Sequence, residues 1–196
     1  MNFIFDVGNV LIDFKPLAFL GNLFSEQLVV EKMYKTIFQS PEWERFDYGT
    51  ITHEEACDVF CLRELDFQAE IRQTMQNLKD ILTPIADTVV LLPEIKEAGH
   101  GLYYLSDNHK ELSRHLLETY LFFDLFDGGV FSCDVQITKP SIEIYHYLLE
   151  KYQLDPRECL FFDDKEENVT AAHKAGIRGV LFTGVTCVNP FLNPTK

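Results

Sequence analysis

Short apolar segments that end at polar residues are the strongest indication of the fold in this sequence of 196 residues. The clearest segments and the residues that follow them are 2–5 before Asp6, 101–105 before Ser106, and 159–162 before Asp163. Segments of this length that are apolar throughout are typical of buried parallel strands. Two weaker segments bring the set of predicted strands to five, and these are residues 129–131 and 179–182.

Helical patterns separate the predicted strands. They cover residues 84–98, 109–120, 141–152 and 166–175. Pro84 suits the first turn of the first helix, Gly99 suits its end, and Pro93 predicts a kink within it. Alternating strands and helices predict an α/β fold with a doubly wound, Rossmann-like parallel sheet and right-handed crossovers. Ligands bind such sheets at the carboxyl ends of the strands, where these polar residues lie.

Residues 16–83 do not follow this alternation. Aromatic and aliphatic residues recur there at helical spacing, and Thr52 with Glu55 three residues later forms a capping box that opens a helix. We therefore expect an all-helical cap domain at 16–83, inserted after the first strand, with residues 1–15 and 84–196 forming the α/β core. The alternative is a set of extra helices packed directly on the core.

The charge balance argues against two classes of partner. The chain has 17 basic and 31 acidic side chains and a net charge of −14, so it repels nucleic acid and anionic membranes. It also repels phosphorylated small molecules at long range, so a site for one must be built locally. No apolar run reaches the roughly 18 residues of a membrane span. The first residues, which include Asp6, do not resemble a signal peptide.

The five cysteines are odd in number and lack the spacing of a disulfide framework. Without a signal peptide, this predicts reduced thiols and a cytoplasmic protein. Cys57 and Cys61 lie one helical turn apart, but no second pair or histidine partner follows, so we expect them to pack in a core. The histidines show no ligand spacing and are expected at the surface or at helix ends. Monomer and homodimer are equally compatible with the sequence.

Several polar residues fall at or just past the predicted strand ends, and these are Asp6, Ser106, Lys139, Asp163 and Asp164. Three carboxylates in one cleft repel one another unless one is protonated or a cation lies between them. Carboxylate oxygens and waters are the usual ligands of Mg²⁺, and Lys139 can neutralise both a nucleophilic carboxylate and an incoming anion. Ser106 and the N–H groups after it can donate hydrogen bonds to a transferring phosphoryl group. The set predicts phosphoryl transfer through an aspartyl phosphate.

The same residues lie in motifs that resemble those of the haloacid dehalogenase-like hydrolases, a superfamily in which phosphatases predominate. Four motifs occur in order across the whole chain: FDVGNVLID, YLSDN, ITKPSIEIY and FFDDKEENVTAAHKAG. The resemblance implies that Asp6 is the nucleophile and a Mg²⁺ ligand, together with the backbone carbonyl of Gly8 and the carboxylate of Asp164. It implies that Asp163 is an auxiliary ligand or supports the ligands.

The resemblance also implies which residues bind the substrate, namely Ser106, Asp107, Asn108 and Lys139. Two asparagines allow two interpretations each. Asn108 either touches the substrate or caps the helix predicted at 109–120. Asn168 either steadies the loop that carries the acidic pair or is an ordinary residue of the first helical turn.

One position departs from the family pattern. Phosphatases of this family usually have an aspartate two residues after the nucleophile, where it acts as general acid and base, and here that position is Gly8. Glycine still supplies a carbonyl ligand but no proton shuttle, and general acid–base help is worth about 10²–10⁴ in rate. Asn9, a water or the substrate would have to assist. The D-x-G-N-V form of the first motif is similar to a branch that includes bacterial phosphatases of sugar phosphates such as glucose 1-phosphate.

The expected function is a Mg²⁺-dependent phosphatase of a small phosphorylated metabolite, for which the resemblance favours a sugar phosphate. Substrate choice in such enzymes is largely set by the cap, where Trp43 is the only tryptophan. Trp43 either stacks on a sugar ring and excludes water, or it packs the cap against the core.

Three other functions fit parts of the same pattern. A 2-haloacid dehalogenase uses the same aspartate nucleophile on carbon, without a metal, but the acidic pair at 163 and 164 disfavours a carboxylate substrate. The second is a binding or regulatory protein that has this fold but has lost catalytic turnover, and this function would explain why position 8 is glycine. A two-component receiver domain shares the acidic pair and the Lys-Pro, but it carries the acidic pair near its start rather than near its end.

Overall fold

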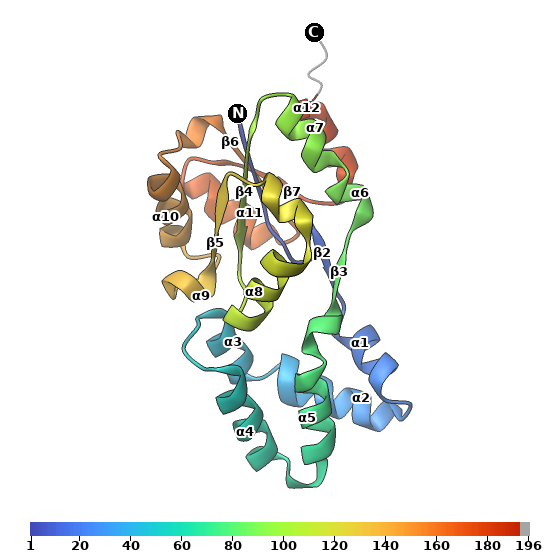
Figure 1. Cartoon of the computed structure of the whole chain (residues 1–196). Helices are drawn as coiled ribbons and strands as arrows, with labels where there is room; N and C mark the ends of the chain where they lie inside the picture. Colours follow the sequence, from blue (N-terminus) through green and yellow to red (C-terminus); the bar gives the residue numbers. More distant parts are fainter. Residues whose placement is uncertain (193–196) are drawn as a thin grey trace.

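The computed structural model describes residues 1–192 and has a five-stranded parallel sheet at its centre (Figure 1). The strands lie in the order β5-β4-β1-β6-β7. Their bounds are β1 Asn2–Phe5, β4 Gly101–Ser106, β5 Gly128–Phe131, β6 Cys159–Asp163 and β7 Arg178–Leu181. All five predicted strands are confirmed, with ends that differ by at most one residue. Phe5, the last residue of the central strand, pairs with Tyr104 on one side and Phe162 on the other, so the three strands end within two residues of one another.

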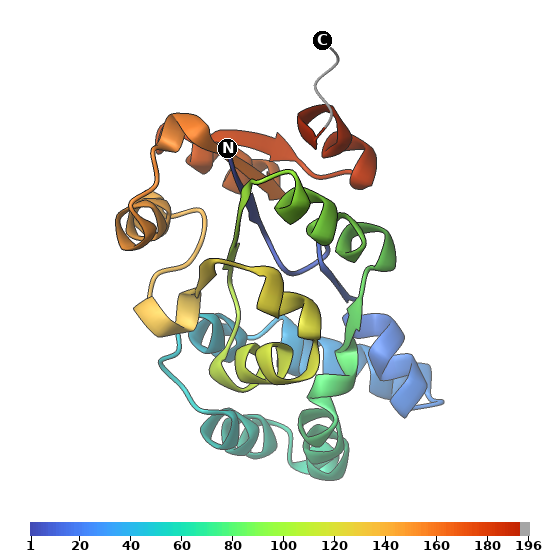
Figure 2. The same ribbon diagram turned by 45° about the horizontal axis from the view of Figure 1, so that its top comes forward.

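Helices cover both faces of the sheet (Figure 2). Alternate residues of β1 face opposite sides: Phe3 and Phe5 belong to one apolar cluster and Ile4 to the other. The cluster around Phe3 and Phe5 contains residues of α7 Leu91–Glu97 and α8 Lys110–Thr119. The cluster around Ile4 contains residues of α10 Ile142–Tyr152 and α11 Glu166–Lys174. Three short helices complete this part, namely α6 Ala86–Val89, α9 Ser132–Val135 and α12 Asn189–Leu192.

An antiparallel ribbon that the sequence did not indicate connects the sheet to the remaining helices. It pairs β2 Ile12–Phe14 with β3 Leu82–Pro84, so the chain leaves and re-enters the sheet region along neighbouring strands. The prediction of one helix over 84–98 was therefore wrong at its start, because Pro84 ends a strand. The helical segment also divides at Val90 and not at Pro93. Pro93 falls in the first turn of α7, where a missing N–H costs no helical hydrogen bond.

Five helices form the segment between the two ribbon strands, at the lower end of Figure 1. They are α1 Pro16–Leu23, α2 Gln27–Met33, α3 Pro41–Asp47, α4 His53–Arg63 and α5 Gln68–Gln76. The capping box is confirmed, because Glu55 N donates to the Thr52 hydroxyl and Thr52 N donates to the Glu55 carboxylate. Cys57 and Cys61 are free thiols buried within these helices, as expected. The division into two domains at 16–83 stays a prediction.

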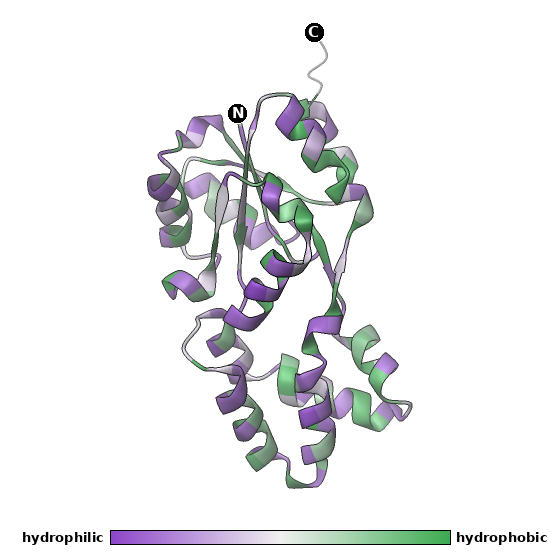
Figure 3. Ribbon diagram, viewed as in Figure 1, coloured by the Kyte–Doolittle hydropathy of each residue, from purple (hydrophilic) through white to green (hydrophobic). Residues whose placement is uncertain are grey.

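The α/β architecture is thus confirmed, with a helical segment inserted after the first strand of the sheet. Figure 3 shows hydrophilic and hydrophobic residues together on α4, α5 and α8, as is typical of helices that cover a core. Within residues 1–192, no helix combines the length and the apolar character that crossing a bilayer demands.

Candidate active site

A single cavity lies where the carboxyl ends of β1, β4 and β6 meet the inserted helices. Asp6 follows β1, Ser106 ends β4 and Asp163 ends β6, so the parallel register brings the three side chains to one edge. The cavity has a volume of about 170 Å³. Its walls include eight of the nine residues predicted for the site, namely Asp6, Gly8, Trp43, Ser106, Asp107, Asn108, Lys139 and Asp164. The ninth, Asp163, lies directly behind them and is fully buried.

Lys139 forms the electrostatic centre of the site. Its Nζ lies 2.8 Å from Asp6 Oδ1 and 2.7 Å from Asp163 Oδ2, and all three residues are buried. Burial alone would lower the pKa of Lys139, but Asp6, Asp163 and Asp107 together raise it above its usual range. The lysine is therefore a fixed positive charge, placed between two carboxylates that would otherwise repel each other.

Asp6 combines a free oxygen with a perturbed pKa. Its Oδ1 accepts hydrogen bonds from Val7 N at 2.7 Å and from Lys139 Nζ, whereas Oδ2 has no partner within residues 1–192. Burial raises the pKa of Asp6 to about 7, Lys139 opposes this shift, and Asp163 adds to it. A second positive charge beside Oδ2 would restore the ionised form that a nucleophile requires.

Asp163 is saturated with hydrogen bonds. Its Oδ1 accepts from Lys165 N at 2.8 Å and from Asn168 Nδ2 at 3.0 Å, and its Oδ2 accepts from Lys139 Nζ and again from Asn168. These four bonds use the roughly four acceptor positions of a carboxylate. Asp163 therefore orients Lys139 and the loop that follows β6. Asn168, which is also buried, holds the Asp163 carboxylate in place. The structure favours this positioning role of Asn168 over the interpretation as an ordinary helical residue.

The donor set for a cation is present. Carboxylate oxygens of Asp6, Asp163 and Asp164 all lie within 4.8 Å of one another. Because the oxygens of Asp163 already accept four hydrogen bonds, the carboxylates of Asp6 and Asp164 are the available donors, and hard oxygen donors of this kind suit Mg²⁺. The structure thus fits the expected Mg²⁺ site.

Asn9 supports this site in a way that the sequence did not indicate. Its Nδ2 donates to Asp164 Oδ2 at 3.1 Å, and its Oδ1 accepts from Phe14 N at 3.2 Å. The backbone of Asn9 has a positive φ of 56°, a conformation that asparagine tolerates better than most residues. Because its amide is occupied by these contacts, Asn9 fixes Asp164 and β2 and is a poor candidate for proton transfer.

The loop after β4 places three polar residues on the cavity. Ser106 is buried, and its hydroxyl makes only a long contact of 3.4 Å with the Asp107 carbonyl, so the hydroxyl is available to a ligand. Asp107 Oδ1 accepts a hydrogen bond from Lys139 N at 2.9 Å, and this bond connects the loop that carries Lys139 to the loop after β4. Asn108 does not cap α8, because its Oδ1 accepts from His109 N and the helix has no side-chain cap.

Of the two alternatives for Trp43, the structure shows the packing role, and stacking on a substrate stays a prediction. Its ring lies 4.8 Å from Phe38 and 5.9 Å from Phe14 between centroids, so it packs the inserted helices against the ribbon. It also lines the cavity, where the apolar wall continues through Ile12, Phe14, Leu82, Leu112 and Leu116. His109 packs against the same aromatic group and is 2% exposed. It is at a helix end as expected, but it is not at the surface.

Asp47 also lines the cavity, and no role was predicted for it from the sequence. It is the last residue of α3 and lines the same cavity as Asp6. Burial raises its pKa to about 7, the negative charge of Asp107 adds to the shift, and Lys165 and Lys139 oppose it. Within residues 1–192 its carboxylate has no hydrogen-bond or ion-pair partner. No sequence pattern marks this environment, because it arises from the contact between α3 and the sheet.

We expect Asp47→Asn to raise the melting temperature of the metal-free protein at pH 8 but not at pH 4. The native carboxyl keeps its proton up to about pH 7, whereas the ordinary value is 3.8. The protonated carboxyl therefore contributes fully to the free energy of unfolding below pH 3.8. This contribution is lost as the pH rises through 7. At about 1.4 kcal/mol per pH unit the effect amounts to a few kcal/mol. Thermal unfolding in EDTA measures it, and equal differences at both pH values would contradict the shifted pKa.

Three comparisons with known proteins agree with this geometry. The family model of the haloacid dehalogenase-like hydrolases matches residues 1–176. Sesquiterpene phosphatase astK of Aspergillus oryzae is 31% identical over 192 residues, which cover 94% of this chain and 92% of that protein. The phosphorylated carbohydrates phosphatase of Thermotoga maritima is 28% identical over 198 residues, covering 90% and 82%. The solved structure of a HAD family enzyme from Bacteroides thetaiotaomicron, in complex with magnesium and inorganic phosphate, has a TM-score of 0.74 at 21% identity, covering 93% and 94%.

Proposed function

Because the chain belongs to the haloacid dehalogenase-like hydrolases, we propose that it is a Mg²⁺-dependent phosphatase in which Asp6 is the nucleophile. The observation that carries the proposal is the arrangement of Asp6, Lys139 and Asp164 around one cavity. Lys139 holds one oxygen of Asp6, and the other oxygen is free to attack. The phosphatases among the relatives support the same reaction class.

Each residue then has a distinct task. Asp6 Oδ2 attacks phosphorus and forms an aspartyl phosphate, while Lys139 neutralises charge on Asp6 and on the phosphoryl group. The Ser106 hydroxyl donates a hydrogen bond to a phosphoryl oxygen. Asp6, Asp164 and the Gly8 carbonyl would hold Mg²⁺, which would supply positive charge to the phosphoryl oxygens. Water then attacks the phosphorus of the aspartyl phosphate, which frees Asp6 and releases phosphate.

The cavity wall bears on the substrate. Six apolar residues besides Trp43 line the same cavity as the charged groups, and their side chains offer a substrate no hydrogen bonds. We therefore propose a phosphate monoester of an alcohol whose organic part is largely apolar, in keeping with the activity named for the Aspergillus relative. The sugar phosphate expected from the sequence is the second candidate. Asp47 and Asn108 line the cavity as hydrogen-bonding groups, and the Thermotoga relative is named for phosphorylated carbohydrates.

Phosphate release from a substrate panel tests the proposal. The panel contains prenyl and short alkyl phosphates, sugar phosphates and aryl phosphates, each with Mg²⁺ and with EDTA. We expect release that requires Mg²⁺ and is fastest with the apolar alkyl esters. Preference for sugar phosphates would favour the second candidate. Halide release from 2-haloacids, with no phosphate release from any ester, would instead indicate a dehalogenase.

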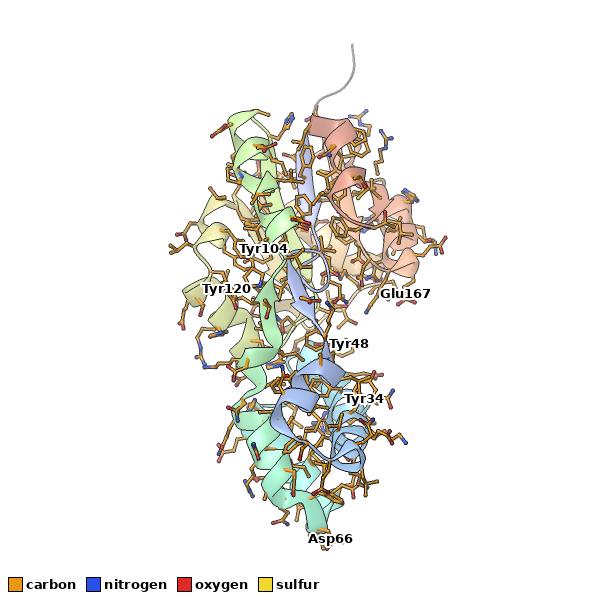
Figure 4. All side chains as sticks on the ribbon, turned by 90° about the vertical axis from the view of Figure 1, so that its right-hand side faces the viewer. Tyr34, Tyr48, Asp66, Tyr104, Tyr120 and Glu167 are labelled. Carbon is orange, nitrogen blue, oxygen red and sulfur yellow. The ribbon has the colours of Figure 1, made fainter. Side chains whose placement is uncertain are left out.

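We expect Asp164→Ala to raise the Mg²⁺ concentration for half-maximal activity by about 10–100-fold, because loss of a ligand or its support costs at least this much affinity. We expect the variant to keep its fold and its nucleophile, because Asp164 is half-buried and its side chain accepts one hydrogen bond, from Asn9. Mg²⁺ titrations of the rate measure the effect. Asp66→Asn is the control, because Asp66 lies at the far end of the inserted helices (Figure 4). An unchanged Mg²⁺ dependence in Asp164→Ala would place the metal elsewhere.

A further inference from the structure

The proposed phosphatase lacks a proton donor at the usual place. Cleavage of an alkyl phosphate produces an alkoxide, which leaves slowly unless an acid protonates it, and such help is worth about 10²–10⁴ in rate. Gly8 has no side chain, and a Cβ built on it has no neighbour within 4 Å. The position is therefore open space beside Asp6 and not a site filled by another group. If the enzyme turns over alkyl esters, another residue must supply the proton.

We propose that Asp47, carried by the inserted helices, is the general acid and base of this active site. The inference rests on the proposed function and adds a catalytic residue to it. Asp47 ends α3 and lines the cavity from the side opposite the sheet. Its carboxylate has no hydrogen-bond or ion-pair partner in the described part of the chain, unlike Asp163, whose oxygens are all occupied.

The backbone around Asp47 is fastened to the loop that carries the phosphate-binding residues. The hydroxyl of Ser132, which is fully buried, donates to the Asp47 carbonyl at 2.5 Å and accepts from Asn108 N at 3.0 Å. Two residues later, Gly49 has a φ of +66°, and a Cβ there would lie 2.5 Å from the Cys133 carbonyl oxygen. Tyr48, between them, lies where the inserted helices meet the sheet region (Figure 4). The contact therefore requires glycine at 49 and holds Asp47 at the cavity.

The charges around Asp47 suit a group that gives up and regains a proton. Asp107 and Glu44 oppose its ionisation, whereas Lys165 and Lys139 favour it, and burial is the largest influence. The result is a pKa of about 7, close to the operating range of a general acid. Apart from Asp6 and Asp164, the remaining acid of the cavity is Asp107. Burial raises its pKa as well, but its Oδ1 accepts from Lys139 N, which favours the charged form and occupies that oxygen. Asp47 has no such bond.

The proton balance of the two steps is complete with Asp47. As Asp6 Oδ2 bonds to phosphorus, the bond from phosphorus to the alcohol oxygen breaks, and the Asp47 carboxyl donates its proton to that oxygen. Asp47 is then ionised and takes a proton from water as the water oxygen attacks the phosphorus of the aspartyl phosphate. The bond between phosphorus and Asp6 breaks, phosphate leaves, and both carboxyl groups return to their initial state.

The test compares two leaving groups in Asp47→Asn. An alkyl phosphate needs a proton on its leaving oxygen, whereas the leaving group of 4-nitrophenyl phosphate is stable as an anion. We expect kcat/KM to fall by about 10²–10³-fold for the alkyl ester and by less than about threefold for the aryl ester. Asp66→Asn, remote from the cavity, is the control and should change neither value. An equal fall for both esters would show that Asp47 only shapes the site and would overturn the inference, as would no fall for either.

A second experiment measures the rate of dephosphorylation, the step in which water attacks the aspartyl phosphate. Because Asp47→Asn also lacks the base for water attack, rapid mixing with 4-nitrophenyl phosphate should give a burst of one nitrophenolate per enzyme, and then slow turnover. A steady rate equal to that of the unsubstituted enzyme would overturn the basic role of Asp47. Failure of the proposed function itself is distinguishable, since the unsubstituted protein would then release no phosphate from either ester.

Discussion

Asp6→Asn is expected to lower phosphate release by at least about 10⁴-fold, because loss of a nucleophile removes the covalent route altogether. The amide has the size of the carboxyl, can accept from Val7 N as Asp6 does at 2.7 Å, and leaves Lys139 paired with Asp163. Burial disfavours the charge of Asp6, whose pKa it raises to about 7, so the neutral amide should not weaken the fold.

Steady-state rates and thermal unfolding of the same preparations measure this prediction. We expect the melting temperature of Asp6→Asn to equal or exceed that of the unsubstituted protein in EDTA, while the rate falls to background. Asp66→Asn provides the matched aspartate-to-asparagine control and should keep full activity. A folded Asp6→Asn protein with a tenth or more of the normal rate would rule out Asp6 as nucleophile.

Lys139→Met is expected to have the largest effect on stability. It removes the single cation that lies 2.8 Å from Asp6 and 2.7 Å from Asp163, and leaves both buried carboxylates uncompensated. Removing one partner of a buried ion pair typically costs 3–5 kcal/mol, so we expect a loss of about 3–5 kcal/mol near pH 7.5. The loss should shrink toward pH 5, because burial raises the pKa of Asp6 to about 7, and protonation of Asp6 below this value removes its repulsion with Asp163. In the unsubstituted protein the raised pKa of Lys139 keeps its stabilising charge throughout this range.

Urea unfolding at both pH values measures the effect of Lys139→Met. The control is Lys15→Met, which breaks the ion pair between Lys15 and Asp13 on a largely exposed side chain. Exposed pairs contribute at most about 1 kcal/mol, so this control should change the free energy of unfolding little. If the two variants lose the same stability, Lys139 is not the electrostatic centre that the geometry indicates.

The sheet could be predicted from the sequence because its strands are short and apolar on both faces. NFIF and CLFF have no polar face that a helix or an exposed strand would need, and β1 has the predicted bounds. The catalytic edge followed directly, since Asp6, Ser106 and Asp163 stand at the ends of three adjacent parallel strands. The resemblance to the haloacid dehalogenase-like hydrolases, which rested on the same residues, is confirmed.

Features that depend on contacts between distant segments could not be predicted. The ribbon joins Ile12–Phe14 to Leu82–Pro84, each too short to show a strand period, and Pro84 resembles the first residue of a helix. No motif surrounds Asp47, because its environment is created by burial, by Asp107 and by lysines that are distant in sequence. The hydrogen bonds of Ser132 and Asn9 are likewise tertiary and leave no local pattern.

An acid supplied by the inserted helices has a consequence for the chemistry. Asp6, Lys139 and Asp164 belong to the sheet region, whereas Asp47 belongs to the inserted helices. Asp47 reaches the cavity only while the segment from 47 to 49 stays docked on Ser132 and Cys133. If Asp47 is the acid, as we propose, protonation of the leaving group depends on this contact between the inserted helices and the sheet region.

Chemical trapping of the phosphorylated enzyme is the most direct measurement of the proposed mechanism. The enzyme is mixed with substrate and Mg²⁺, quenched during turnover, and treated with borohydride, which reduces an aspartyl phosphate to homoserine. Peptide mass spectrometry then locates the modified residue. We predict homoserine at position 6, only when both substrate and Mg²⁺ are present, and none in Asp6→Asn. Phosphate release with an unmodified Asp6, or with the modification at another residue, would contradict the proposed nucleophile.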